Sequence, residues 1–481
     1  MPNRTKVLIV GGGLGGLLLA ILLERAGIEY WVLEQSVLVR PIGSVIALSP
    51  LVLPLMEQLG LLEEIERLSK PVAGLTFLRD DLSTIGRIIF NDNNRGMDHQ
   101  QRYGNYDQTI PRPDLYNLLL THIPPDRIKR GKRLVNFKQT ETEVTVRCSD
   151  GTFYTAEILV GADGAASTVR TSLYRQMKDA RVLPRADQEP EKYRHVCLIG
   201  VTNPLSLKRY PDLGLRFSTF KIVLSKNSPY MCWFMPIQGH RYAWLVSRAL
   251  DEPVVVNSGN SDQSEWSREA TEEMSKSVRH LMCPDGGTVG DLIDCTPREV
   301  MAKVMLEDRH FRTWHHGRTV LLGDACHKSV PFTGKGANES MLDAAVLASL
   351  IYDMPSSNQQ EISRLFKKYA QTRSPITKKM VDQSSKVGAL LVNRSWTGSL
   401  LRTLLFSLQN TWKYRTEIDK MHLHRYQATF LPFVPDRGAV PRLAQTPSVN
   451  VIHKDWKREQ EEKKQHRQSV LGNILDFPAV V

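Results

Sequence analysis

The chain contains 481 residues, of which 41% are hydrophobic and 24% are charged, so it is long and apolar enough for two or three domains with a large core. Its formal net charge is +12, but basic residues are not interleaved with aromatic ones as in a nucleic-acid-binding module, and we expect no nucleic-acid partner. No run of about 18 apolar residues and no signal peptide are visible, which predicts a cytoplasmic protein that is neither secreted nor membrane-spanning.

The first structural signal is a glycine turn near the N-terminus. The apolar segment 6–10 predicts a buried strand, and 17–23 predicts a buried helix. Between them, Gly11, Gly13 and Gly16 fit G-x-G-x-x-G, whose glycines permit a tight turn, close approach of a pyrophosphate and close helix packing. The helix N-terminus favours anions, so this turn predicts a dinucleotide site.

A second strand, predicted over 30–33, ends at Glu34. An acid at this position accepts hydrogen bonds from the adenosine ribose hydroxyls of a bound dinucleotide. This strand supports the dinucleotide site but does not decide between NAD and FAD.

Two further signatures follow predicted buried strands. The first is Gly-Ala-Asp-Gly at 161–164, ahead of a helix predicted from Ser167. The second is Gly-Asp at 323–324, followed by a glycine-rich loop and a helix predicted from about Ala337. An acid at a strand end can hold a sugar-like hydroxyl, and a helix start can hold partial negative charge. In the same segment, we interpret His327 as a loop residue that fixes local structure and Cys326 as a packing residue.

The six cysteines do not form a C-x-x-C pair, so we expect no metal site and no disulfide framework. They are scattered, at Cys148, Cys197, Cys232, Cys283, Cys295 and Cys326.

The three signatures occur in a defined order and together resemble a known family. They are G-x-G-x-x-G with Glu34, Gly-Ala-Asp-Gly-x-x-Ser-x-Val-Arg, and Gly-Asp-x-x-His-x-x-x-Pro-x-x-Gly-x-Gly-Ala-Asn. Over residues 1 to about 355, the chain resembles single-component FAD-dependent monooxygenases of the aromatic-hydroxylase type. The sequences Gly-Asp-x-x-His-Lys and Phe-Leu-Pro-Phe-Val-Pro-Asp-Arg-Gly (430–438) are similar to fungal secondary-metabolism hydroxylases and epoxidases.

The resemblance implies an α/β fold in which a Rossmann-like FAD-binding domain (1–180 and 311–355) joins an α+β substrate domain (181–310), followed by a helical C-terminal region (356–481). Four β-like runs fit a sheet that covers the flavin, at 195–201, 220–224, 231–235 and 242–246.

In the C-terminal region, the charged segment 367–386 predicts a surface helix, and the basic end of the chain from about Gln445 predicts a mobile, solvated tail. Peripheral membrane contact stays an alternative for this tail and for the apolar segment 397–408, for which a core helix is the simpler interpretation. The sequence does not indicate an oligomeric state.

The resemblance also implies a reaction. FAD, reduced by the co-substrate NADPH, would use O₂ to insert one oxygen atom by epoxidation or hydroxylation. The substrate would be a small hydrophobic molecule, namely a terpenoid, meroterpenoid or polyketide intermediate of fungal secondary metabolism. NADH as the donor is not excluded, and the absence of a second glycine fingerprint fits a family without a separate nicotinamide domain.

The resemblance carries over residue by residue. For the nucleotide half of FAD, it implies that Gly11, Gly13 and Gly16 bind the pyrophosphate and that Glu34 binds the adenosine ribose. It places Arg112 and the segment 43–47, including Ala47, close to the FAD. For the flavin half, it implies Asp163 near the flavin, Asp324 for the ribityl chain, and Gly336, Ala337 and Asn338 beside the flavin ring.

The resemblance also suggests catalytic residues, and the chain departs from the family pattern at two positions. Arg194 and Tyr230, with Tyr193 as an alternative to the latter, are candidates for anchoring substrate or moving a proton, although a sheet-surface arginine and a packed tyrosine are equally consistent with the sequence. Lys335 replaces a common glutamine; beside the flavin it would favour the reduced anionic ring, and otherwise it would face solvent. The usual acid pair in the following helix is reduced to Asp343.

Rival functions stay open at this stage. A flavin-dependent halogenase would need a W-x-W-x-I-P segment, which Trp233-Phe-Met-Pro does not match. An FAD-dependent dehydrogenase or oxidase, or a protein that binds FAD without turnover, is compatible with the same cofactor motifs.

Overall fold

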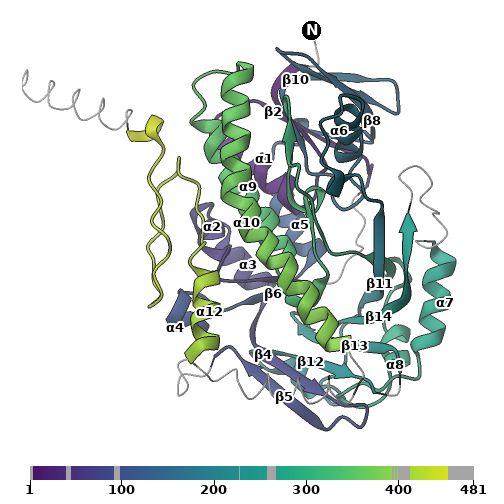
Figure 1. Cartoon of the computed structure of the whole chain (residues 1–481). Coiled ribbons are helices and arrows are strands. Elements are labelled where there is room, and N and C mark those ends of the chain that lie inside the picture. Colours follow the sequence, from purple (N-terminus) through teal and green to yellow (C-terminus); the bar gives the residue numbers. More distant parts are fainter. Residues whose placement is uncertain are drawn as a thin grey trace, which may run out of the picture.

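The computed structural model describes residues 4–38, 45–91, 98–226, 228–256, 267–392, 395, 398 and 412–452. In this part of the chain, the strands form two large sheets at opposite ends of the molecule, and the long helix α10 (Gln359–Val392) runs along both of them (Figure 1). Across the same residues, no helix combines the length and the hydropathy needed to cross a membrane.

The first sheet is the parallel sheet that the N-terminal pattern predicts. Its centre is β1 (Arg4–Val10), paired in parallel with β2 (Tyr30–Glu34) on one side and β10 (Phe153–Gly161) on the other. β10 in turn pairs in parallel with β18 (Thr319–Leu321). The carboxyl ends of β1, β10 and β18 therefore meet at one edge, which brings the three sequence signatures together. The remaining strands of this sheet are β7 (Ile128–Arg130), β8 (Leu134–Gln139), β9 (Val144–Cys148) and β17 (His315–His316).

Two apolar helices cover this sheet because their side chains are apolar on nearly every side. Helix α1 (Leu14–Arg25) buries every residue from Leu14 to Leu23, and it packs against α9 (Gly336–Tyr352). Both helices begin directly after a glycine-rich turn. The other helices of this part are α2 (Leu53–Gln58), α3 (Leu62–Leu68), α5 (Arg112–Thr121) and α6 (Thr168–Asp179).

The second sheet contains all four of the predicted β runs, as parts of β11 (Glu191–Val201), β12 (Ser218–Leu224), β13 (Tyr230–Ile237) and β14 (Arg241–Val256). These strands pair antiparallel, whereas β12 pairs in parallel with β4. The sheet is completed by β3 (Val45–Leu48), β4 (Lys70–Leu78), β5 (Thr84–Ile89), β6 (Gln108–Pro111) and β15 (Ala302–Leu306). Segment 1–180 thus supplies four strands of the second sheet, and the domain boundaries at 180, 310 and 355 stay predictions.

The two faces of the second sheet have different surroundings because side chains alternate along a strand. On one face, Cys232, Phe234 and Trp244 pack under α7 (Arg268–Val278) and α8 (Val289–Asp294). On the other face, Phe220, Met235 and Leu245 point toward the first sheet. The short strands β16 (Arg309–His310) and β19 (His327–Lys328) pair with each other between the sheets.

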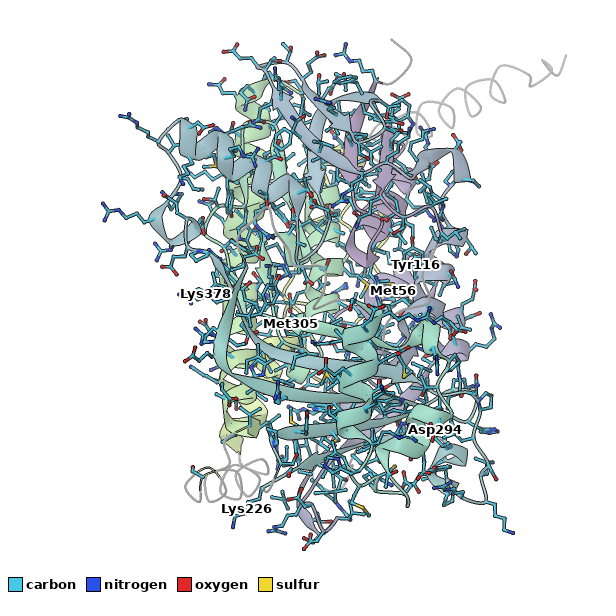
Figure 2. All side chains as sticks on the ribbon, turned by 90° about the vertical axis from the view of Figure 1, so that its right-hand side faces the viewer. Met56, Tyr116, Lys226, Asp294, Met305 and Lys378 are labelled. Atoms are coloured by element: carbon cyan, nitrogen blue, oxygen red, sulfur yellow. The ribbon has the colours of Figure 1, made fainter. Side chains whose placement is uncertain are left out.

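Helix α10 confirms the predicted helix over 367–386, but only one side of it faces solvent. Lys378 forms an exposed ion pair with Asp382 at 2.7 Å and lies at the surface in Figure 2. The opposite side is buried, with Phe366, Tyr369 and Met380 in the core. This amphipathic pattern places α10 against both sheets.

The segment after α10 packs back on the molecule. Helix α12 (Trp412–His422) lies near α4 (His99–Tyr103), where the side chains of Arg102 and Asp419 form an ion pair. Farther along, the Gln445 side-chain NH₂ donates to the carbonyl of Gln427 at 2.9 Å, and Ser448 is buried. These contacts hold the chain to at least Ser448, beyond the point from which a mobile tail is predicted. The basic residues 453–467 and nearly all of segment 397–408 lie outside the described residues.

Candidate active site

A cavity of about 920 Å³ joins the edge of the parallel sheet to the apolar face of the second sheet. One end is lined by the residues that the signatures place at strand ends and helix starts, including Gly13, Gly15, Arg112, Ala162, Gly164, Asp324, Gly336 and Ala337. The other end is lined by apolar side chains, including Val72, Leu75, Phe77, Phe220, Trp233, Met235, Leu245, Phe332 and Leu391.

The glycine turn fits a pyrophosphate, because only the middle glycine faces the cavity. Gly11 has φ +105°, and a Cβ there would collide with the Ala162 carbonyl. A Cβ on Gly16 would collide with the Gly11 carbonyl, so this glycine sets the close packing of α1. A Cβ on Gly13 would meet nothing nearer than 4.0 Å, and Gly13 lines the cavity directly at the N-terminus of α1. The surface that a phosphate group would occupy is therefore kept free of side chains.

Glu34 lies at the end of β2 and supports the glycine turn. Its Oε2 accepts from the Gly12 amide at 2.8 Å, and its Oε1 accepts from the Ser36 amide at 2.7 Å. Each oxygen retains a lone pair for a further donor, as ribose binding requires. Glu34 does not line the 920 Å³ cavity. An adenosine bound to Glu34 would therefore lie outside this cavity, beyond the end that Gly13 lines.

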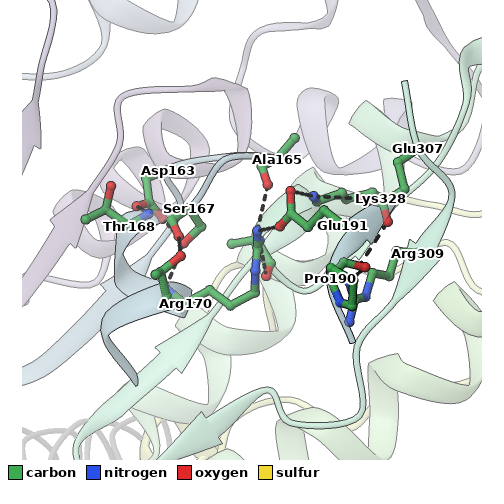
Figure 3. Close-up of polar contacts among 12 residues, drawn as sticks. Asp163, Ala165, Ser167, Thr168, Arg170, Pro190, Glu191, Glu307, Arg309 and Lys328 are labelled. Atoms are coloured by element: carbon green, nitrogen blue, oxygen red, sulfur yellow. Dashed lines mark hydrogen bonds and ion pairs between the residues drawn. The ribbon is translucent and has the colours of Figure 1, made fainter. Parts of the chain in front are cut away.

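Asp163 has a structural role that the sequence did not separate from cofactor binding. Its Oδ1 accepts from the Ser167 hydroxyl at 2.5 Å, and its Oδ2 accepts from the amides of Thr168 and Val169 at 2.7 and 3.0 Å (Figure 3). It therefore satisfies two amides in the first turn of α6, whose N-cap residue is Ser167. Asp163 itself does not line the cavity, whereas its neighbours Ala162 and Gly164 do.

Asp324 directs its side chain into the cavity. The side chain is accessible within the cavity, but the surrounding protein desolvates it, which raises the pKa of its carboxyl; His327, Lys328, Arg170 and Arg112 oppose that rise. Arg112, the first residue of α5, lines the same cavity. A carboxylate and a guanidinium here suit the hydroxyls and phosphates of a nucleotide cofactor.

The glycine-rich loop and β3 are joined by Asn338. The Asn338 Oδ1 accepts from the Ser49 amide at 2.9 Å, and its Nδ2 donates to the carbonyls of Ala47 and Gly334 at 2.8 and 3.1 Å. Asn338 is buried, so it holds Ala47 against the loop and leaves Gly336 and Ala337 to line the cavity. Residues 43–44 of the predicted segment 43–47 lie outside the described residues.

Arg170, from the second signature, connects the parallel sheet to the start of β11. It donates to the Ala165 carbonyl at 2.8 Å and pairs with Glu191 at 2.5 Å (Figure 3). Lys328 bridges Glu191 and Glu307 at 2.9 and 3.1 Å. Arg170 and Lys328 are nearly inaccessible, and this buried network sets the position of the second sheet relative to the cavity.

His327 is buried and hydrogen-bonded to Asp343, as the sequence interpretation of a structural histidine anticipates. Cys326, His327 and Asp343 bring three potential metal-ligand atoms within 4.8 Å of one another. Both Asp343 oxygens are already engaged, however, with Oδ1 accepting from Arg373 at 2.7 Å and Oδ2 from His327 at 2.6 Å. We interpret this group as an internal ion network.

At the end of the cavity that the second sheet forms, four polar side chains make up a cluster. They are His99, Asp107, Lys335 and His422, and all of them line the cavity. His99 Nδ1 lies 2.6 Å from Asp107 Oδ2, and the imidazole stacks on Phe90 at 4.8 Å. Lys335 Nζ lies 3.1 Å from the sulfur of Met421, and burial lowers the pKa of this lysine against the opposing effect of Glu339 and Asp107. Lys335 thus faces the cavity.

Arg194 and Tyr230 are not brought to the cavity. Arg194 is exposed at an irregularity of β11, between Tyr193 and His195. Tyr230 lies on the face of β13 that packs under α7, and its hydroxyl is 3.3 Å from Ser277 Oγ. Tyr193 packs on that same face. Strand alternation instead turns Trp233 toward the cavity.

The sequence did not single out His99, Asp107 or His422. Their shared position arises from three segments that are distant in sequence: α4, the residue before β6, and α12. No local spacing pattern indicates this cluster, and only the unusual Lys335 drew attention to its surroundings.

Comparisons with known proteins agree with this geometry. The sequence profile of a family described as "FAD binding domain" matches residues 4–187 and 222–384. The FAD-dependent monooxygenase penM of Penicillium crustosum is 31% identical over 389 residues, covering 78% of this chain and 76% of penM. The FAD-dependent monooxygenase paxM of Penicillium paxilli is 30% identical over 385 residues, covering 76% of this chain and 75% of paxM.

The fold is shared with a solved structure of lower sequence similarity. Klebsiella pneumoniae HpxO, complexed with FAD and uric acid, matches with a TM-score of 0.67 at 18% identity, covering 88% of this chain and 96% of HpxO. The chain therefore shares the HpxO fold, which here joins a parallel sheet to a mainly antiparallel sheet. The chain belongs to the FAD-binding-domain family and is an FAD-dependent monooxygenase.

Proposed function

We propose that this monooxygenase uses NADPH and O₂ to insert one oxygen atom, by epoxidation or hydroxylation, into a terpenoid, meroterpenoid or polyketide intermediate of fungal secondary metabolism. The observation that carries the proposal is the continuous cavity, which links the glycine turn before α1 to an apolar chamber. The relatives penM and paxM are both fungal monooxygenases, which supports the same assignment.

The cofactor would be held by residues from both sheets. Gly13 and the N-terminus of α1 would accept the pyrophosphate, while Gly11 and Gly16 shape the turn. Glu34 would bind the adenosine ribose, and Asp324 with Arg112 would bind the ribityl and phosphate groups. Ala47, Gly336 and Ala337 would pass close to the flavin, with Asp163 holding the neighbouring turn. When bound and reduced, FAD supplies the activation of O₂ that no amino-acid side chain provides.

The chain's own contribution to the reaction is to position the substrate and to exclude water. Phe77, Phe220, Trp233, Met235 and Phe332 form an apolar wall that favours a hydrocarbon skeleton over water. A substrate held against this wall loses its freedom to reorient before oxygen transfer. The same wall would exclude water from the site of oxygen transfer and so limit side reactions.

The test is an incubation of the FAD-loaded protein with NADPH, ¹⁸O₂ and a fungal metabolite extract, followed by mass spectrometry. A product that gains one ¹⁸O atom, absent when NADPH is omitted, supports the proposal. Hydrogen peroxide formation without a labelled product would indicate a dehydrogenase or oxidase instead. Bound flavin that NADPH does not reduce, with or without extract, would indicate a non-catalytic FAD-binding protein.

A further inference from the structure

The polar cluster of His99, Asp107, Lys335 and His422 lies beside apolar side chains of the cavity wall. His99 is the first residue of α4, and Asp107 directly precedes β6 of the second sheet. His422 is the last residue of α12. Phe90, Ile88 and Leu75 line the cavity beside them. Buried polar groups next to an apolar chamber are costly unless they are hydrogen-bonded, so the exposed edge of this cluster favours a ligand that carries a polar group.

His99 is held in one orientation. Asp107 fixes its Nδ1 at 2.6 Å, and Phe90 covers one ring face at 4.8 Å with an interplanar angle of 15°. Tyr103 and His422 approach its ring at 5.1 and 5.7 Å. In the tautomer whose Nδ1–H donates to the carboxylate, Nε2 carries no hydrogen and is an acceptor.

His422 presents the same chemistry. Its Nδ1 donates to the Ile418 carbonyl at 2.9 Å, and its ring stacks on Tyr103 at 3.9 Å. Burial is the main cause that lowers the pKa of His422 to about 3, so this ring is neutral near pH 7. Its Nε2 is then an acceptor as well. Two fixed imidazole acceptors on one cavity wall match a ligand that donates a hydrogen bond.

Building on the proposed monooxygenase function, we propose that His99, positioned by Asp107 and assisted by His422, binds the hydrogen-bond-donating end of the substrate. The substrate is accordingly a mainly hydrocarbon molecule with an O–H or N–H group at one end. Its apolar part lies along Phe220, Trp233 and Phe332, and the anchored end sets which carbon faces the cofactor.

The experiment measures binding to the FAD-loaded protein by calorimetry with three matched probes: 1-naphthol, 1-methoxynaphthalene and naphthalene. The wild type is expected to bind 1-naphthol roughly three- to tenfold more tightly than 1-methoxynaphthalene, because only the hydroxyl can donate. His99→Phe is expected to remove this preference while retaining naphthalene binding. Asp107→Asn is expected to reduce the preference, since it frees the ring of His99 without changing the volume of the site.

The control is His280→Asn, an exposed histidine at the end of α7, which is expected to keep the wild-type preference. Equal binding of 1-naphthol and 1-methoxynaphthalene by the wild type, an unchanged preference in both site variants, or no binding of 1-naphthol would overturn the proposal. A variant that alters FAD affinity or the flavin spectrum without altering probe preference would make His99 a cofactor contact and would equally overturn it. Because these readouts need no turnover, a failure of the ¹⁸O experiment would leave them interpretable.

Discussion

His327 and Asp343 lie 2.6 Å apart, with both side chains fully buried, and their contact joins the Gly-Asp loop to α9. Arg373 from α10 pairs with the second oxygen of Asp343 and with Glu339. With His327 protonated, the four groups carry two positive and two negative charges. This balanced network connects the loop that carries Asp324 to the long helix that spans both sheets.

The first prediction concerns the pH dependence of stability. Burial opposes charge on His327, but Asp343 outweighs it and raises the histidine pKa above 6.5. The pKa of Asp343 is lowered by His327 and Arg373 against its own burial. The histidine contribution is therefore complete below about pH 6.5 and is lost as pH rises through its folded-state pKa. The aspartate contribution is present above about pH 4 and is lost as pH falls through the depressed pKa.

Urea unfolding between pH 5 and 9 measures this effect. His327→Gln is expected to destabilise the protein by about 3 kcal/mol near pH 6 and by less near pH 9. The exposed His280→Gln is the control and should lower stability at neither pH. A His327→Gln penalty that is the same at both pH values would contradict a charged buried pair.

The second prediction separates two glycines of the same turn. Gly13→Ala adds a methyl group where the cavity offers space, so the cofactor-free protein should keep its stability within about 0.5 kcal/mol. Its FAD affinity should fall at least roughly tenfold, because the methyl group occupies the surface of a bound pyrophosphate. Titration of the flavin fluorescence measures this affinity.

Gly16→Ala is the matched variant, since its methyl group would meet the Gly11 carbonyl. It should lower the unfolding free energy of the cofactor-free protein by roughly 1–3 kcal/mol. If Gly13→Ala binds FAD normally, the phosphate does not lie at this turn.

The third prediction compares two aspartates that follow strand ends. Asp163→Ala removes the acceptor of two amides in the first turn of α6 and should destabilise the cofactor-free protein by roughly 1–2 kcal/mol. Asp324→Ala removes a carboxyl whose charge is disfavoured by burial, so stability without FAD should stay the same or rise. Asp324→Ala should nevertheless bind FAD roughly tenfold more weakly, through the loss of hydrogen bonds to a charged group.

Thermal melts with and without FAD distinguish the two variants. Stabilisation by FAD should shrink in Asp324→Ala and persist in Asp163→Ala. The reverse pattern would assign cofactor binding to Asp163 and a structural role to Asp324.

The fourth prediction concerns Lys335, which lines the cavity where the family often has glutamine. A positive charge beside the flavin stabilises its anionic reduced form. Lys335→Gln should therefore lower the midpoint potential of the bound flavin by roughly 30 mV, equivalent to about 1.4 kcal/mol for a two-electron couple. The difference should shrink as pH rises through the lowered pKa of this lysine.

Dye-equilibration measurements of the flavin potential test this effect without any substrate. Lys379→Gln, on the exposed side of α10, provides the control for a general change in net charge. Equal potentials in the wild type and Lys335→Gln would show that the ammonium group does not act on the flavin.

Local sequence determined the elements that we propose to hold the cofactor, because strands, turns and helices depend on neighbouring residues. An apolar run, a glycine turn and a second apolar run indicate β1 and α1 from adjacent residues alone. Apolar runs likewise indicate the strands that end before Asp163 and Asp324. The pairing of β10 with β1 and with β18 then brings these ends to one edge, and this pairing joins strands that are distant in sequence. Four strands of the second sheet were also visible as short apolar runs.

The tertiary structure alone decided which side chains of the second sheet face the cavity. A shift of one residue along a strand reverses the face, and this is why Tyr230 packs under α7 while Trp233 lines the cavity. It also decided that α12 returns to the cavity and sets His422 beside His99, across more than 300 residues of chain. Such long-range contacts depend on the packing of whole elements, for which the sequence carries no periodic or spacing signal.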